Sequence, residues 1–498
     1  MSTGSSIFSL FSQTAAMRPD APALFVQQQL YSYNLLSYYS HQIASTLPSS
    51  NAIGIGLLAH RSIAAFAGVL GILKSGHAYV PLNPNFPINR LVDTIEAAGI
   101  QTIVYGQECE ALLPALQAQL PNTIAWVSAE NSFTHDEVTH TEGIQHTDIA
   151  YLLFTSGSTG KPKGVPVKHS SVHAYVKTIV DTYKPKHTDR FSQSFDLSFD
   201  LSVHDMFVCW SAGACLYCIP EKAVFAPAKF IREHELTWWF SVPSVIRFLD
   251  QFRMLKAGNF PSLTMSMFCG EALPLSLAVK WQQAANNSQV VNIYGPTEAT
   301  IGISGYTLPE GENKIKHRNG VVSIGKVFEG QLHTILSDAP EKEAGELCLG
   351  GSQLTEGYWH NQEKTDECFF TDAQHRWYKT GDAVIEDNEG DIYYIGRLDF
   401  QAKINGYRVE LEEINHTLNQ RFGVSAYSVA WPVNEGIAAS IYTFFSGHPS
   451  VSTAEMKMEL QQKLPEYMQP KDLIFVASFP LNANGKINKE ALLTLLQS

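Results

Sequence analysis

The stretch YLLFTSGSTGKPKGVPVKH, residues 151–169, is the strongest local signal in this sequence of 498 residues. An apolar run leads into a loop of hydroxyl side chains, small residues and lysines. Backbone N–H groups that small residues leave exposed, together with nearby positive charge, can wrap phosphate oxygens. The spacing G-x-x-x-x-G-K-[ST] of the P-loop does not occur in this loop. The residues favour a phosphate-binding loop of another kind; a surface loop rich in serine and glycine is the alternative.

The apolar run before this loop belongs to a repeated pattern of β-rich segments followed by amphipathic helices. NAIGIGLLAH, residues 51–60, predicts a strand, and SIAAFAGVLGILKSG, residues 62–76, predicts a helix that stops at a glycine. The pattern fills roughly the first 330 residues and is typical of parallel α/β layers. The predicted fold class is therefore α/β.

The pattern changes toward the C-terminus. GELCLGGSQL (345–354) and GDIYYIGRLDF (390–400) predict short strands of a β-rich subdomain. LEEINHTLNQRF (411–422) and TAEMKMELQQKL (453–464) predict helices of a last α+β unit. Because domains usually run to ~100–200 residues, several substructures are expected. We predict a large N-terminal core at 1–396, a hinge at 397–404 and a small C-terminal domain at 405–498.

Composition excludes several classes of protein. Apolar residues make up 45% and charged residues 17%, as in a folded globular chain. The net charge of −13 argues against a nucleic-acid binder, because such affinity comes mainly from Lys and Arg. No apolar run approaches the ~20 residues that span a membrane, so membrane insertion is not expected. The beginning of the sequence lacks a signal-peptide pattern, so we expect a cytoplasmic location. The seven cysteines, including the pair Cys215 and Cys218 in a predicted strand, favour reduced buried thiols over a zinc site.

The loop at 151–169 resembles the phosphate loop of the adenylate-forming superfamily of acyl-CoA synthetases, luciferases and peptide-synthetase adenylation domains. The resemblance recurs in the family's order through most of the chain. Its further segments are GHAYVPLNPNFPINRL from residue 76, NIYGPTEATIG from 292, GELCLGG from 345, WYKTGD from 377, GRLDFQAKINGYRVELEEI from 396 and NANGKINKEAL from 482. It implies a large N-terminal α/β domain with a β-rich subdomain, and a small mobile C-terminal α+β domain that turns about Asp399.

The resemblance also implies roles for individual residues. Tyr294 is expected to stack on adenine beside Asn292, Asp382 to accept from the ribose hydroxyls near Arg397, and Glu298 to bind Mg²⁺. Lys486, Thr297 and Glu298 are the expected catalytic residues, with Lys486 stabilising the charge that develops when a carboxylate attacks the α-phosphate. The expected ATP-binding residues are Thr155, Ser156, Gly157, Ser158, Thr159, Gly160, Lys161, Lys163, Gly270, Glu271, Asn292, Ile293, Tyr294, Gly295, Thr297, Asp382, Arg397 and Lys486.

Amino-acid-activating members of the superfamily carry an Asp in an F-D-x-S segment that pairs with the substrate's α-ammonium. QSFDLSFDLSVHDMF contains FDLS twice, and its second copy continues the family pattern, which favours Asp200 over Asp196. Carrying over the pocket gives Asp200, Leu201, His204, Ser241, Met267, Cys269, Ile301 and Gly302. The large side chains in this set favour glycine as substrate and alanine as second choice. The set is similar to that of a glycine ligase that feeds a carrier protein in lipid A modification.

The resemblance implies ATP and Mg²⁺ as cofactors and transfer of the acyl group to a phosphopantetheine thiol. Only twelve residues follow Lys486, so the carrier protein is expected to be a separate chain and the enzyme a monomer. One alternative is an acyl-CoA or aryl-CoA ligase, against which Asp200 argues, because a buried unpaired carboxylate facing an apolar tail is costly. A second is a larger-amino-acid enzyme of a peptide-synthetase pathway. A third, a scaffold without activity, is disfavoured because Lys486, Glu298 and Asp382 are present.

Overall fold

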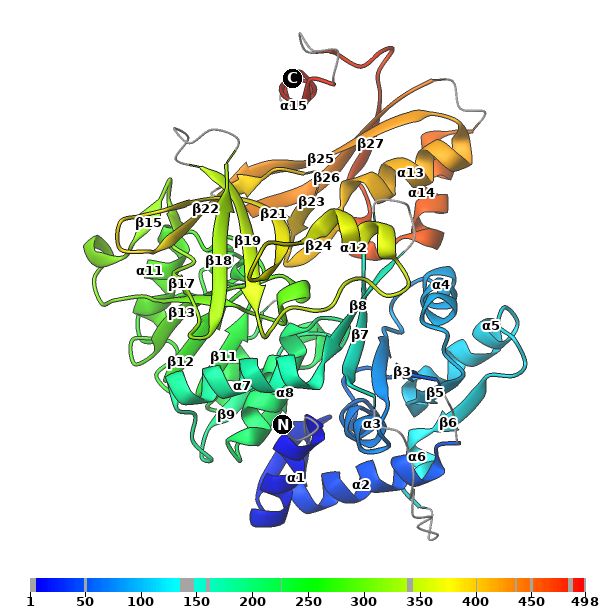
Figure 1. Cartoon of the computed structure of the whole chain (residues 1–498), viewed down its shortest axis with the longest axis vertical. Helices are drawn as coiled ribbons and strands as arrows, with labels where there is room; N and C mark the ends of the chain where they lie inside the picture. The colour runs from blue at the N-terminus through cyan, green and yellow to red at the C-terminus, as the bar shows by residue number, and fades with distance from the viewer. Residues whose placement is uncertain are drawn as a thin grey trace.

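The structure is a computed structural model that describes residues 6–48, 52–134, 147–157, 162–224, 226–337, 344–399, 401–434, 437–447, 451–481 and 487–496. Its strands form two large sheets, a β-rich sheet with a two-stranded ribbon beside it, and a C-terminal sheet. The two large sheets carry parallel strands with helices packed on them, which confirms the predicted α/β class (Figure 1).

A six-stranded sheet forms most of the first part of the chain. Its order is β6 (Ala125–Ser128), β5 (Thr102–Tyr105), β3 (Gly54–Leu58), β4 (Ala78–Leu82), β7 (Ile149–Thr155), β8 (Lys163–Lys168). The first five strands are parallel, and β8 is antiparallel to β7. The segment 151–169 therefore contains most of β7 and all of β8, which pair as a hairpin. The helices of this part are α2 (Tyr33–Thr46), α3 (Ile63–Lys74), α4 (Ile88–Ala98), α5 (Leu113–Gln117) and α6 (Ala129–Ser132).

A nine-stranded sheet lies beside it. Its order is β17 (Lys326–Val327), β14 (Ser304–Thr307), β13 (Gln289–Tyr294), β12 (Met265–Phe268), β11 (Trp238–Ser241), β9 (Arg190–Gln193), β10 (Cys215–Cys218), β1 (Pro22–Val26), β2 (Gln29–Ser32). The helices of this part are α1 (Phe8–Met17), α7 (His169–Tyr183), α8 (Leu201–Ser211), α9 (Ala228–Glu233), α10 (Pro243–Gln251) and α11 (Leu275–Ala284). All seven cysteines are free and six are buried, and the predicted strand at Cys215–Cys218 is confirmed.

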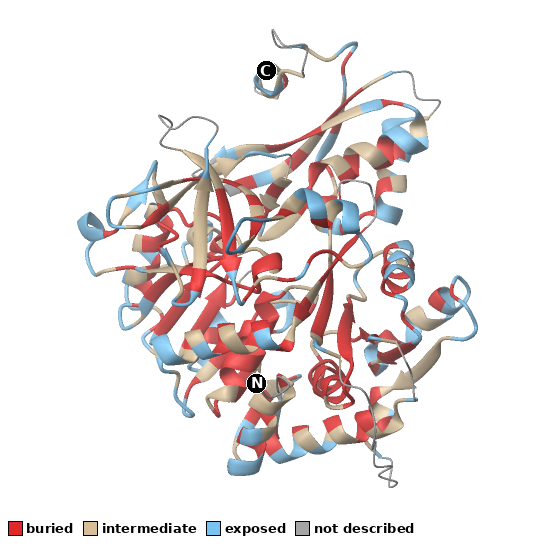
Figure 2. Cartoon of the chain, in the orientation of Figure 1, coloured by how far each residue is buried: buried red, intermediate tan, exposed pale blue. Residues whose placement is uncertain are grey.

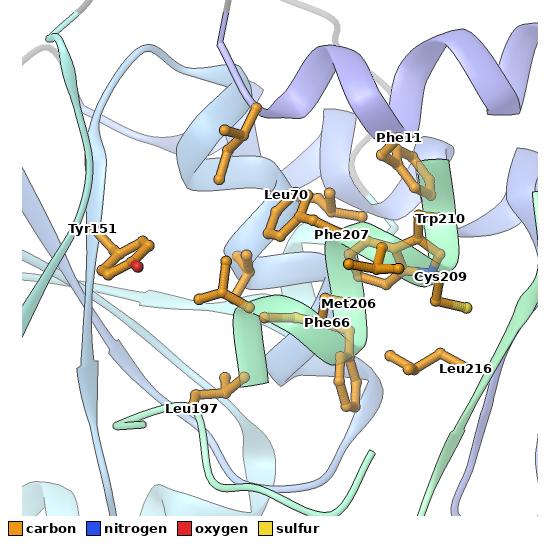
Figure 3. Close-up of a cluster of buried hydrophobic side chains, with 14 of the residues drawn as sticks. Phe11, Phe66, Leu70, Tyr151, Leu197, Met206, Phe207, Cys209, Trp210 and Leu216 are labelled. Atoms are coloured by element: carbon orange, nitrogen blue, oxygen red, sulfur yellow. The ribbon is translucent and has the colours of Figure 1, made fainter. Parts of the chain in front are cut away.

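The main core joins the two large sheets through helices α3 and α8. Every residue of α3 except Lys74 is buried, and α8 is buried from Leu201 to Trp210 (Figure 2). Phe66 of α3 and Phe207 of α8 lie in one apolar cluster (Figure 3). Burying large apolar side chains stabilises a fold by about 1.5–3 kcal/mol each, so this core holds the N-terminal part together as one body. Helix α8 therefore fixes Asp200, which directly precedes it, at a rigid position.

The predicted β-rich subdomain is present. Its five strands are β18 (Gln331–Leu336), β19 (Gly345–Gly351), β20 (Phe369–Thr371), β21 (Arg376–Glu386) and β22 (Ile392–Arg397), with helix α12 (Gln362–Cys368) and the ribbon β15 (His317–Arg318) and β16 (Val321–Val322). The described pairings within this sheet are all antiparallel. Its strands β21 and β22 carry Asp382 and Arg397 to the same edge, because these two residues are paired in register.

The last part of the chain forms its own five-stranded sheet and core. The strands are β23 (Gln401–Ile404), β24 (Tyr407–Glu410), β25 (Ser425–Asn434), β26 (Ile437–Ser446) and β27 (Asp472–Phe475), and the helices are α13 (Leu411–Phe422), α14 (Thr453–Lys463) and α15 (Lys489–Thr494). Helix α13 ends where Gly423 takes a φ of +64°, and a capping box of Ser452 and Glu455 starts α14. These two helices are those predicted from the sequence. The hinge at 397–404 and the boundaries around it stay a prediction.

In the part of the chain that the structure describes, no helix combines the length and the apolar content that crossing a membrane requires.

Candidate active site

A cavity of about 110 Å³ lies where the ends of the large sheets meet the β-rich sheet and the C-terminal sheet. The predicted site residues that line it are Thr155, Ser156, Asp200, Leu201, Cys269, Gly270, Tyr294, Gly295, Thr297, Asp382 and Arg397. A smaller adjoining hollow is lined by Gly270, Glu271, Asn292, Ile293, Tyr294 and Gly295, together with Lys403. The fold thus gathers side chains from most of the chain around one space.

The adjoining hollow contains a buried polar atom that is open to a ligand. Asn292 is almost fully buried at the end of β13, and its side-chain nitrogen donates to the Ser323 carbonyl at 2.9 Å. Its side-chain oxygen has no hydrogen-bond partner among the described residues. Because buried polar atoms are normally paired, this oxygen is an open acceptor beside the Tyr294 ring. An exocyclic amino group of a purine would supply the missing donor.

A hydrogen-bond network fixes Asp382 at the edge of the first cavity. The Tyr294 hydroxyl donates to Asp382 Oδ2 at 2.5 Å, and Arg397 Nη1 donates to Asp382 Oδ1 at 2.8 Å. Arg397 also donates through Nε to Asp399 Oδ1 at 2.9 Å. A carboxylate has about four acceptor positions, so Asp382 keeps capacity for two hydroxyl donors of a sugar.

Glu298 is the most deeply buried charge of the site. It lies in the short helix η3 (Thr297–Ala299) and is 0% exposed. Its Oε1 accepts from the Tyr358 hydroxyl at 2.7 Å, and its Oε2 accepts from Arg408 Nη1 at 2.8 Å. Burial alone would raise the pKa of Glu298, but the charges of Arg408 and Lys163 lower it to about 2. The carboxylate is therefore ionised at neutral pH.

An ionised carboxylate is the ligand type that Mg²⁺ prefers, so Glu298 fits the predicted metal role by its chemistry. The described residues hold no group of three or more His, Cys, Asp or Glu side chains that could bind a metal ion by themselves. A cation here would take most of its remaining ligands from substrate phosphates and water, which is how Mg²⁺ is usually held beside nucleotides. In the arrangement seen, Arg408 occupies Glu298 Oε2.

The described part of the phosphate loop contacts the C-terminal sheet. Ser156 Oγ donates to the Arg408 carbonyl at 3.0 Å and accepts from the Glu410 N–H at 3.1 Å. Burial and the charge of Arg408 lower the pKa of Lys163, whose Nζ lies 3.3 Å from Glu410 Oε1. The Gly157 N–H also contacts the C-terminal part of the chain, because it donates to Glu413 Oε2 at 3.1 Å. The predicted residues Ser158, Thr159, Gly160, Lys161 and Lys486 lie outside the described residues.

Asp200 lines the first cavity. Its Oδ2 accepts from the Ile301 N–H at 3.3 Å. Burial raises the pKa of Asp200 to about 6, although hydrogen bonds from Thr297 and the Ile301 N–H oppose this. No ion pair joins Asp200 to another described residue, so its charge is not balanced by the protein there. A bound cation would relieve this cost.

The space behind Asp200 is filled by protein. Among the predicted pocket residues, His204, Ser241, Met267, Ile301 and Gly302 do not line the first cavity, although all five are buried. His204 Nδ1 is 2.8 Å from the Tyr175 hydroxyl, and burial lowers its pKa to about 3, so its ring is neutral. A Cβ added at Gly302 would come within 2.4 Å of Ile293 Cγ2. Ser241 lines a second cavity, and the other four predicted residues line neither cavity.

A second cavity of about 480 Å³ opens between the N-terminal part and the C-terminal sheet. It adjoins the first cavity at a set of shared lining residues: Phe86, Phe199, Leu201, Gly406, Tyr407 and Tyr467. The Tyr407 and Tyr467 rings stack at 3.9 Å, and Phe199 meets Tyr407 edge-on at 4.9 Å. Side chains from both parts of the chain thus form an aromatic neck between the two cavities.

Sequence reasoning missed the residues that the C-terminal sheet contributes. Arg408, Glu410, Glu413 and Gly406 all contact predicted ATP-site residues, and the Gly406 N–H donates to Glu271 Oε1 at 2.7 Å. They lie in GRLDFQAKINGYRVELEEI, where the sequence patterns predict only a hinge followed by a helix. The run of charged residues directly after the predicted hinge is the sequence signal that could have indicated these contacts.

Comparisons with known proteins show the family of the chain. A sequence model of the family described as AMP-binding enzyme matches residues 11–359. The chain is 30% identical over 502 residues to a D-alanine--D-alanyl carrier protein ligase of Bacillus cereus, and the match covers 97% of this chain and 96% of that protein. The chain is also 31% identical to surfactin synthase subunit 2 of Bacillus subtilis. That match covers 98% of this chain but only 14% of the much longer synthase subunit.

The fold also matches a solved structure. The adenylation domain AlmE of Vibrio cholerae, determined in complex with glycyl-adenosine-5'-phosphate, superimposes with a TM-score of 0.87 at 30% sequence identity. The match covers 100% of this chain and 98% of the AlmE chain. The family match and these relatives show that the chain belongs to the AMP-binding enzyme family, as an adenylate-forming ligase.

Proposed function

We propose that this protein activates glycine, or alanine as second choice, with ATP and Mg²⁺, and transfers the aminoacyl group to the phosphopantetheine thiol of a separate carrier protein. In the first half-reaction an oxygen of the amino acid carboxylate attacks the α-phosphorus of ATP, and pyrophosphate leaves. In the second, the thiol sulfur attacks the acyl carbon, its proton is released, and AMP leaves. The similarity to AlmE supports the first half of this proposal, and the similarity to the D-alanine--D-alanyl carrier protein ligase supports the second.

The observation that carries the amino-acid assignment is Asp200. This buried carboxylate lines the first cavity, has a raised pKa and lacks an ion-pair partner among the described residues. An α-ammonium group would satisfy it, whereas the tail of a fatty or aryl acid would leave it unpaired at a cost of several kcal/mol. Asp200 therefore favours an amino acid over the acyl-CoA and aryl-CoA alternatives.

The small substrate is supported by the filled space behind Asp200. His204, Met267 and Gly302 are buried and line neither cavity, which supports a substrate with little or no side chain. The glycyl adenylate bound to AlmE agrees with this size. A larger-amino-acid enzyme of a peptide-synthetase pathway is the second candidate, and the substrate panel below separates the two.

We propose the following roles for the nucleotide site. Asn292 and Tyr294 bind adenine through the open amide oxygen and the ring face, and Asp382 accepts from the ribose hydroxyls. Thr155, Ser156 and Lys163 bind phosphate oxygens. Mg²⁺ held by Glu298 would neutralise phosphate charge and orient the leaving group. Lys486, which lies outside the described residues, is proposed to stabilise the charge that develops on the α-phosphate.

The second cavity supports the transfer step. It leads from the surface between the two parts of the chain to the aromatic neck beside Leu201, which also borders the first cavity. We propose that the phosphopantetheine arm enters this way, because an arm must bring its thiol to the adenylate while the carrier protein stays outside.

The decisive experiment is amino-acid-dependent exchange of pyrophosphate into ATP, measured for a full panel of amino acids and for fatty and aryl acids. Glycine should give the highest kcat/KM and alanine the next. A preference for a bulky or charged amino acid would refute the small substrate, and a preference for an acid without an amino group would refute the amino-acid assignment.

A further inference from the structure

The predicted Mg²⁺ ligand is occupied by a cation of the protein itself. Arg408, on β24 of the C-terminal sheet, donates to Glu298 Oε2 at 2.8 Å, and the Arg408 side chain is 21% exposed. The other oxygen of Glu298 accepts from the Tyr358 hydroxyl. The positive charge of the Arg408 guanidinium repels a metal ion that approaches the same carboxylate.

The predicted phosphate donors are occupied by anions of the same short segment. The Gly157 N–H donates to Glu413 Oε2 at 3.1 Å, and Lys163 Nζ lies 3.3 Å from Glu410 Oε1. Glu413 is fully buried and its other oxygen pairs with Arg90. Two carboxylates thus take a backbone donor and an ammonium group that are both suited to phosphate oxygens.

We propose that segment 408–413 is an internal mimic of magnesium pyrophosphate, with Arg408 in the place of the metal and Glu410 and Glu413 in the place of phosphate oxygens. Docking of this segment and binding of magnesium pyrophosphate are then mutually exclusive. This inference rests on the proposed function, because pyrophosphate is the product of the first half-reaction. It adds that the C-terminal sheet takes the orientation seen here only after pyrophosphate and its metal have left.

The pattern of charge separates this mimic from an ordinary interface. Each charge matches the sign of the group it would replace: a cation on the metal-binding acid, and anions on the two phosphate donors. Buried ion pairs lose much hydration energy and are poor sources of net stability. Stability alone therefore does not account for the three ion pairs that residues 408–413 form, which are Arg408–Glu298, Glu410–Lys163 and Glu413–Arg90. Another contact of the same interface, Arg247 to Asn405 at 3.4 Å, involves no predicted phosphate or metal ligand.

The proposal is tested by following the orientation of the C-terminal sheet directly. Two exposed methionines, Met17 on α1 and Met458 on α14, are replaced by cysteine and labelled with a fluorophore pair for energy transfer. Cys368→Ser removes the described cysteine that is not buried. The full chain is titrated with magnesium pyrophosphate, with Mg²⁺ alone and with pyrophosphate plus EDTA. Magnesium pyrophosphate should shift the transfer efficiency in a saturable way, and each component alone should need a higher concentration.

Variants of the mimic should respond at lower concentrations. Removing an internal competitor raises the populated fraction of the binding-competent state, so Arg408→Gln and Glu413→Gln should each lower the half-saturating magnesium pyrophosphate by about tenfold or more. Arg421→Gln is the matched control, since Arg421 lies on the same helix as Glu413 but pairs with Glu459 at 3.0 Å and is largely exposed. Its half-saturating concentration should equal that of the unaltered chain.

Two outcomes would overturn the proposal: saturation with magnesium pyrophosphate, verified by calorimetry, without a change in energy transfer, or unchanged or weakened affinity in both variants. If circular dichroism shows that Arg408→Gln is misfolded, the unaltered chain and Glu413→Gln still decide the question. The titration uses neither amino acid nor carrier protein. A failed substrate panel would therefore refute the proposed function without altering this result, and a flat titration would refute the mimic alone.

Discussion

The Ile301 N–H reaches the Asp200 carboxylate at 3.3 Å because the backbone at Thr300 and Ile301 is in the left-handed region, with φ of +57° and +70°. Two consecutive β-branched residues rarely adopt this conformation, and such strain persists only where the surroundings enforce it. Gln353 supplies that restraint. It is fully buried, and its side-chain nitrogen donates to the Gly302 carbonyl at 2.8 Å and lies 3.2 Å from the Ala299 and Thr300 carbonyls.

We therefore expect Gln353→Met to loosen the loop that positions Asp200. The lost hydrogen bonds leave buried carbonyls unpaired, which should lower the free energy of unfolding by about 1–3 kcal/mol. The KM for the amino acid should rise several-fold while the KM for ATP changes little. Denaturant unfolding and pyrophosphate exchange measure the two effects. Gln362→Met, at an exposed position of α12, is the control, and an unchanged amino acid KM in Gln353→Met would show that the loop does not position Asp200.

The raised pKa of Asp200 predicts how activity depends on pH. The carboxylate must be ionised to bind an ammonium group, and burial raises its pKa to about 6 in the free enzyme. Because kcat/KM reports ionisations of the free enzyme, kcat/KM for the amino acid should fall about tenfold per pH unit below 6. The kcat/KM for ATP, measured at saturating amino acid, should fall much less over the same pH range. A pH profile without a step between 5 and 7 would contradict this assignment.

The same shift has a consequence for stability. A carboxyl whose pKa is higher in the folded state than in the unfolded state favours folding at low pH, and this contribution is lost as pH rises from about 4 to 6. A shift from 3.8 to about 6 corresponds to at most roughly 3 kcal/mol. Asp200→Asn should therefore make the protein more stable at pH 7.5, although it removes amino acid activation. Comparing denaturant unfolding at pH 5 and pH 7.5 measures this; a destabilised Asp200→Asn protein at pH 7.5 would count against it.

Local sequence patterns predicted the elements that carry the site. The helix at 411–422 follows from its apolar spacing and its glycine stop, and the strand before the phosphate loop follows from an unbroken apolar run. The contacts of Arg408 and Glu413 did not follow, because they depend on how the C-terminal sheet is oriented against residues that lie far away along the chain. The restraint by Gln353 was missed for a similar reason: a polar residue in a loop carries no local sign of burial.

Lys486 is predicted to act in the first half-reaction. If its ammonium group stabilises the charge that develops on the α-phosphate, Lys486→Ala should slow adenylate formation at least ~10²-fold, roughly 2.7 kcal/mol of barrier, and leave ATP affinity nearly unchanged. Single-turnover adenylate formation and equilibrium ATP binding measure the two quantities. Lys489→Ala, at an exposed position of α15 on the same stretch of chain, is the control. Adenylation at the unaltered rate in Lys486→Ala would remove the residue from catalysis.

The predicted hinge can be tested at Asp399, whose Oδ1 accepts from Arg397 Nε at 2.9 Å and from the Gln401 N–H at 3.1 Å. Proline at this position fixes one backbone angle, so Asp399→Pro should hold one orientation of the C-terminal sheet and impair one half-reaction far more than the other. Asp399→Asn keeps the backbone free and should affect both much less. Exchange activity and thioester formation are measured separately. Equal losses in Asp399→Pro would indicate damage to folding or to a shared contact instead of a hinge.

The most demanding prediction concerns the substrate. Leu201 lines the first cavity beside Asp200, so we expect a methyl group added at the α-carbon to meet its side chain at a cost of about 1–3 kcal/mol. Glycine should therefore exceed alanine in kcat/KM by roughly 10-fold or more, and valine or phenylalanine should be almost inactive. Leu201→Ala opens volume beside the α-carbon and should narrow the gap between glycine and alanine. Asp200→Ala should abolish use of every amino acid.

Leu277→Ala is the matched control for Leu201→Ala. Leu277 is a buried leucine of α11 that lines neither cavity, so its loss costs core packing without changing the pocket. The two variants should lose comparable stability, but only Leu201→Ala should change the ratio of alanine to glycine activity. If both variants keep the ratio of the unaltered enzyme, Leu201 does not set the substrate size. If Asp200→Ala retains full activity, the ammonium has another partner and the amino-acid assignment loses its main support.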